Sequence, residues 1–122
     1  MSEFIEVKFG DLERAALDWA IASIDGEDHW TSDRNIDWWL NGRTFRPSTD
    51  WLEGGRLMAD YCVAVVPLDN VCSQWFSTAF FDGLTFDNCY KAEGETHLIA
   101  ACRAIVHAKL GETVLVPKEL VR

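Results

Sequence analysis

The chain is short of the cations and long apolar runs that would assign it to nucleic acid or a membrane. Its 122 residues contain 11 Lys and Arg against 20 Asp and Glu, which gives a formal net charge of −9. Phosphate contacts need clustered Lys and Arg, so we expect no direct binding to nucleic acid. No apolar run approaches the roughly 20 residues of a membrane span. Residues 1–11 also lack the basic and apolar regions of a signal peptide, and we expect a cytoplasmic protein without a membrane partner.

The sequence also lacks the ligand spacing of a metal site. It contains four cysteines and three histidines, namely Cys62, Cys72, Cys89, Cys102, His29, His97 and His107. No two cysteines form a C-x-x-C pair, and the histidines do not complete such a pattern. We therefore expect no metal and no cofactor, and free thiols that behave as small apolar side chains.

Catalytic motifs are missing too. Ser48, Asp50 and His97 are the residue types of a hydrolase triad, but no nucleophile-elbow pattern surrounds Ser48. Residues of this kind before a helix usually cap its free N–H groups. Cys102 and His107 lie five positions apart in an expected helix, which places them on different faces. We therefore expect that the chain is not an enzyme.

The composition is that of a folded globular protein, with 48% hydrophobic residues, and the length fits one domain over residues 1–122. The patterns predict helices at 12–24, 56–61 and 97–110, strands at 3–9, 62–66 and 74–81, and a strand or an extended arm at 113–117. The connection that includes residues 88–95 has room for a short edge strand. The two amphipathic helices at 12–24 and 97–110 each need an apolar partner, which the strands supply. We therefore predict an α+β fold in which a small, mainly antiparallel sheet packs against two amphipathic helices.

Caps and breakers set the expected helix boundaries. Asp11, Asp50 and Thr96 each precede a helical stretch and have side chains that accept hydrogen bonds from a first turn. Gly54-Gly55 disfavours a helix, so the helix at 56–61 is expected to begin only after this pair.

Arg103 lies one step off the apolar stripe of the helix at 97–110. We therefore expect its guanidinium at the surface. A surface substitution such as Arg103→Ala should then change stability by less than about 0.5 kcal/mol.

An acidic, tryptophan-rich insertion at about 28–46 is the unusual part of the chain. Asn41-Gly42 lies between apolar residues, which predicts a hairpin at 36–46. Adjacent residues of a strand face opposite sides, so Trp38 and Trp39 cannot both enter one core. One of them is therefore exposed or covered by a partner, unless it folds over the edge of the sheet.

Exposed aromatic residues with acidic neighbours are typical of an interaction surface. The candidate binding residues are Trp38, Trp39, Asp33, Asp37 and Trp51. Three arginines, Arg43, Arg46 and Arg56, cluster in a chain that is otherwise acidic, and are the candidate ligand-binding residues of an alternative site.

Three segments resemble the phage NinX-like proteins and the related phage ABA sandwich domain. They are ALDWAIA (16–22), FRPSTDWLEGGRLM (45–58) and THLIAACRAIVHAKLGETVLVPKEL (96–120), which cover about half of the chain. The resemblance implies helices that cover a sheet, and a small phage or prophage accessory protein in a bacterial host cell. It implies no particular activity. Arg56 stands where the family usually has proline and Cys102 where methionine is common, and residues 28–42 and 67–94 have no counterpart.

Two functions fit these observations. The first is a protein that binds a host or phage protein, for example as an inhibitor of a host defence or nucleic-acid enzyme, because acidic surfaces compete with nucleic acid for basic clefts. The alternative is a small-molecule binder such as a nucleotide-signal sponge, in which Trp and Arg residues of 38–56 hold a base and a phosphate. Homo-oligomerisation stays open.

Overall fold

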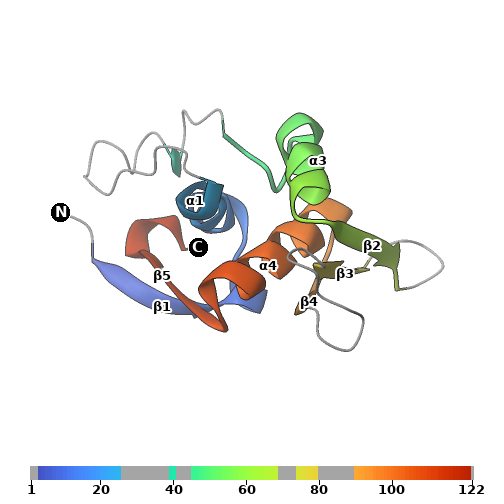
Figure 1. Ribbon diagram of the computed structural model, residues 1–122. Helices are drawn as coiled ribbons and strands as arrows, with labels where there is room; N and C mark the ends of the chain where they lie inside the picture. The colour runs from blue at the N-terminus through green and yellow to red at the C-terminus, as the bar shows by residue number, and fades with distance from the viewer. Residues whose placement is uncertain (1–2, 26–38, 41–44, 69–73, 80–89, 122) are drawn as a thin grey trace.

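The computed structural model describes residues 3–25, 39–40, 45–68, 74–79 and 90–121 (Figure 1). Along the chain, its elements are β1 (Phe4–Lys8), the 3-10 turn η1 (Phe9–Asp11), α1 (Arg14–Asp25), α3 (Trp51–Asp60), β2 (Val63–Pro67), β3 (Trp75–Ala79), β4 (Tyr90–Gly94), α4 (His97–Leu110), β5 (Thr113–Pro117) and the 3-10 turn η5 (Lys118–Leu120). The predicted α+β fold with antiparallel pairing is confirmed.

The strands form two sheets rather than one. β1 pairs antiparallel with β5, so the first and last strands of the described chain are neighbours. β2, β3 and β4 form a three-stranded antiparallel sheet in chain order. α4 runs through the middle of the molecule, packs on the three-stranded sheet and contacts α1, while α1 also contacts β5 (Figure 1).

The main core lies around α1 and α4. Small side chains on α4, including Ala100, Ala101 and Ala104, are buried and let its neighbours approach closely. Larger apolar side chains fill the rest of the core: Leu12, Leu17, Ile21, Trp39, Leu57, Ile105, Val106 and Val116. Asp18 of α1 is also fully buried, although it carries a carboxyl group. A buried carboxylate needs hydrogen bonds, and one of them comes from the backbone N–H of Ser48 at 2.9 Å.

The prediction that Gly54-Gly55 interrupts a helix is wrong, because α3 runs continuously through both glycines. Asp50 begins the helix as predicted, since its carboxylate accepts a hydrogen bond from the N–H of Leu52. Gly54 is buried where the start of α3 meets α4, and a Cβ there would lie 2.5 Å from the carbonyl oxygen of Pro47 and 2.6 Å from a methyl carbon of Leu98. This close packing outweighs the low helix propensity of glycine.

The other boundaries differ only at their ends. Asp11 does not cap α1, because it lies in η1 and the helix begins at Arg14. Thr96 does cap α4, through a hydrogen bond that its hydroxyl accepts from the N–H of Ile99, and Gly111 ends that helix with φ of 95°. The predicted hairpin at 36–46 lies mostly outside the described residues.

Candidate functional site

An exposed aromatic surface lies where α3 begins. Trp51 is 53% exposed and the next residue, Leu52, is 83% exposed. The ring of Trp51 meets the ring of His97 edge to face, with 4.3 Å between the ring centroids. Trp75 of β3 lies on His97 as well, at 4.9 Å, so His97 contacts both indole rings. We call Trp51, Leu52 and His97 the α3 surface.

A hollow of about 200 Å³ opens beside Trp51. It is lined by Ser48, Thr49, Trp51, Thr96, His97, Leu98 and Ile99. The turn before α3 and the first turn of α4 thus form its two walls. The buried hydrogen bond from Ser48 N–H to Asp18 fixes the turn, and the Thr96 cap fixes the start of α4. The hollow is therefore held by elements that are rigid at the backbone.

The three residues of the hydrolase hypothesis are not arranged for proton transfer. The hydroxyl of Ser48 is buried and has no hydrogen-bond partner within the described residues. The Asp50 carboxylate caps α3 through the N–H of Leu52. Nδ1 of His97 accepts a hydrogen bond from the N–H of Leu98. A nucleophile would need a base within hydrogen-bond reach, and Ser48 has none here.

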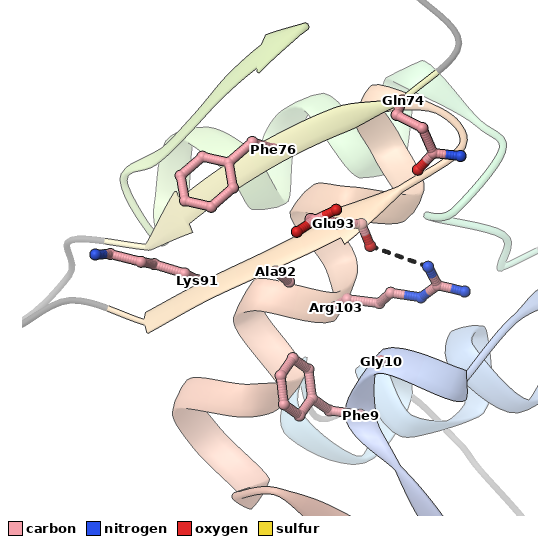
Figure 2. A pocket seen from close by; sticks show the side chains of 8 residues that line it. All are labelled: Phe9, Gly10, Gln74, Phe76, Lys91, Ala92, Glu93 and Arg103. Carbon is pink, nitrogen blue, oxygen red and sulfur yellow. Dashed lines mark hydrogen bonds between the residues drawn. The ribbon is translucent and has the colours of Figure 1, made fainter. Parts of the chain in front are cut away.

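A second hollow, of about 330 Å³, lies between the edge of β4 and the turn η1 (Figure 2). It is lined by Phe9, Gly10, Gln74, Phe76, Lys91, Ala92, Glu93 and Arg103. Figure 2 shows Arg103 reaching from α4 toward the edge of β4, with Phe9 and Gly10 on the other side. The hollow combines aromatic rings with two cations and one carboxylate.

Arg103 is the residue that the sequence prediction placed wrongly, because it is partly buried and not a free surface side chain. Its Nε donates to the carbonyl oxygen of Leu12 at 2.8 Å, and its Nη1 donates to that of Glu93 at 2.9 Å. Burial lowers the pKa of Arg103 from its ordinary value, while Glu13 and other carboxylates nearby oppose that shift. The group stays charged near neutral pH, because the ordinary pKa is far above 7.

The structure places the other candidate residues as follows. Trp39 is fully buried in the core, which excludes it as an exposed anchor. Arg46 and Arg56 are exposed, and Arg56 forms an ion pair with Asp60 at 3.0 Å.

Four candidates, Trp38, Asp33, Asp37 and Arg43, lie outside the described residues. The sequence prediction missed Leu52, although its position next to the candidate Trp51, after the predicted cap Asp50, was a usable signal.

The described cysteines differ in environment. Cys62 is exposed and Cys102 is buried, and both are free thiols. Burial raises the pKa of Cys102 well above its ordinary value, and the carboxylate of Asp18 raises it further. Cys102 is therefore a protonated core thiol. In the described part of the chain, no three His, Cys, Asp or Glu side chains gather as metal ligands. None of the described helices has the length and apolar character needed to cross a membrane.

Two antiparallel sheets and a central helix, with an exposed aromatic surface and open hollows, define a small α+β protein. The chain belongs to the family described as Bacteriophage P22, NinX, whose model matches residues 8–109. The match spans the first two segments of the resemblance and most of the third, so the resemblance is confirmed. The protein is thus a phage accessory protein. No curated protein matches the chain.

Proposed function

We propose that this phage accessory protein acts by binding a host or phage protein, and not by catalysis. The observation that carries the proposal is the exposed pair Trp51 and Leu52 at the start of α3, which are 53% and 83% exposed. These large apolar side chains are exposed to water at the start of a capped helix. A partner that covers them removes apolar surface from water, which favours binding. Tryptophan is also among the residues that contribute most at protein interfaces.

The α3 surface is organised before any partner arrives. The Asp50 cap holds the backbone of the first turn, and His97 supports one edge of the Trp51 ring. An anchor that is already fixed loses little conformational entropy on binding. The neighbouring hollow of about 200 Å³ has room for one side chain of the partner. The surface therefore offers both a projecting anchor and a receiving cavity.

The net charge of −9 favours a partner with a basic surface. An acidic protein associates faster with such a partner and competes with the nucleic acid that the partner binds. We therefore propose that the partner is a nucleic-acid enzyme or a defence protein of the host, which the phage protein inhibits. The association rate should fall steeply as salt is added, because exposed charges are screened.

The test begins with capture of partners from a lysate of infected bacteria, followed by binding measurements with the purified partner. Trp51→Ala should weaken binding by at least about 2 kcal/mol, mostly through faster dissociation. Leu52→Ala should weaken it less, and Leu115→Ala is its matched control, since Leu115 is a 58% exposed leucine on β5. Unchanged affinity in a Trp51→Ala and Leu52→Ala double variant would reject the α3 surface.

A second candidate function, binding of a small anion such as a nucleotide, is favoured by Arg103 rather than by Arg56. Arg103 faces the hollow of about 330 Å³, and no carboxylate of the described residues forms an ion pair with it. Its remaining N–H donors suit a phosphate, and Phe9 offers a ring for stacking.

A thermal-shift screen with a nucleotide panel tests this candidate. One nucleotide should raise the melting temperature, and Arg103→Lys should reduce that rise more than Arg56→Lys does. Absence of any shift across the panel would reject it.

A further inference from the structure

Every second residue of β1 forms backbone hydrogen bonds with β5, and the residues between them leave the other edge of β1 open. The N–H of Lys118 donates to the carbonyl of Glu3, and the N–H of Phe9 donates to the carbonyl of Glu112. With the register that joins β1 to β5, these bonds place the odd-numbered residues of β1 in hydrogen-bonded pairs. The even-numbered residues therefore direct their N–H and C=O groups away from β5.

These outward-facing residues are Phe4, Glu6 and Lys8, and all three side chains are exposed. Among the described residues, no group bonds the backbone of Glu6 or Lys8 on this side, and neither side chain has a partner. A strand edge with unpaired backbone groups is a template for another strand.

Two other strand edges carry side-chain contacts or a proline. On β4, the carbonyl of Lys91 lies 3.3 Å from Nδ1 of His107, and the carbonyl of Glu93 accepts from Arg103. β5 ends at Pro117, which has no N–H to donate. The outer edge of β1 has neither a side-chain hydrogen bond to its backbone from the described residues nor a proline, although its residues Glu6 and Lys8 are charged.

We propose that this edge pairs with β1 of a second copy of the chain, so that two two-stranded sheets join into one continuous sheet. In an antiparallel pairing centred on Val7, Glu6 of each copy lies opposite Lys8 of the other. Both residues direct their backbone groups toward this edge, and their side chains share the exposed face. The two-fold symmetry repeats this arrangement, so the dimer contains two Glu6–Lys8 pairs. The outward-facing N–H and C=O groups of both strands also gain hydrogen-bond partners.

The charges select this register over its neighbours. A shift by two residues places Glu6 opposite Glu6, where like charges repel. A shift by one residue would set outward-facing backbone groups against inward-facing ones.

Sedimentation equilibrium at low ionic strength, over a range of protein concentrations, tests the proposal. The wild type should dimerise, and Glu6→Lys or Lys8→Glu should each raise the dissociation constant by about tenfold, because each reversal places like charges in both pairs. Lys91→Glu is the matched control for Lys8→Glu, since Lys91 is an exposed strand lysine on the other sheet, and its dimer should be unchanged.

An equimolar mixture of the two reversed variants is the sharper test. The Glu6→Lys strand carries two cations and the Lys8→Glu strand two anions, so a heterodimer should form at concentrations where each variant alone is monomeric. Glu6→Pro removes only an outward-facing N–H and should give a folded monomer. A monomeric wild type, a dimer insensitive to both reversals, or a mixture without heterodimer would each overturn the proposal. This pairing is independent of the α3 surface.

Discussion

Replacing Arg103 with alanine tests whether the hydrogen bonds of one side chain link the N-terminal segment to the edge of a sheet. Its guanidinium joins the carbonyl of Leu12 to the carbonyl of Glu93, which lie on elements distant in sequence (Figure 2). A hydrogen bond from a charged donor contributes roughly 1.5 kcal/mol or more when it is partly buried, and less when it is exposed. The bond to Leu12 is partly buried and the bond to Glu93 is exposed. We therefore expect Arg103→Ala to lower the free energy of unfolding by about 2 kcal/mol.

Thermal and urea unfolding measure this loss. About 2 kcal/mol corresponds to a melting temperature lower by roughly 8 °C for a domain of this size. Arg103→Lys should recover only part of the loss, because an ammonium group lacks the planar fork that reaches two carbonyls. Arg56→Ala is the control, since its exposed ion pair with Asp60 should contribute less than about 0.5 kcal/mol. If the Arg103→Ala and Arg56→Ala variants had equal free energies of unfolding, the linking role of Arg103 would be refuted.

Four further predictions concern other features of the protein. In urea unfolding, Gly54→Ala should destabilise the protein by about 3 kcal/mol, because its Cβ would collide with two groups. Gly55→Ala should instead stabilise it by up to about 1 kcal/mol, because the nearest atom to that Cβ lies at 3.7 Å and alanine favours a helix. Asp50→Ala should cost about 1 kcal/mol through loss of the helix cap, and an unchanged melting temperature would contradict that role. In the native protein, a maleimide should label Cys62 quickly and Cys102 only after unfolding, as read by peptide mass spectrometry. Because the pKa of Cys102 is raised by folding, its contribution to stability should be full below about pH 8 and decline at higher pH, where the unfolded thiol ionises first.

Local signals predicted the elements that depend on local physics. The cap at Thr96 and the glycine at 111 bracket α4, and both lie where hydrogen bonding requires them. Asp50 caps α3 for the same reason. Alternation of side chains was sufficient for β1, because Ile5 and Val7 face inward and their neighbours face water. Such features need only a few consecutive residues, which the sequence displays directly.

Contacts between distant segments could not be predicted in the same way. Gly54 is tolerated in a helix because Pro47 and Leu98 approach it, and nothing in the local sequence places Leu98 there. Arg103 is held by Leu12, which lies 91 positions earlier in the chain. The division into two sheets also follows from long-range pairing, since β1 bonds to β5 and leaves the three central strands separate.

The segments that carry the family resemblance meet one another in space. Asp18 of the first accepts the N–H of Ser48 in the second, and Gly54 of the second packs on Leu98 of the third. These contacts are buried and structural, so the resemblance describes how the helices assemble and does not specify what they bind. The exception is Trp51, which belongs to the second segment but has about half of its surface exposed to solvent. The ring of Trp51 is fixed by its contact with His97 and is left about half exposed. Substitution of Trp51 should therefore reduce binding more than it reduces stability.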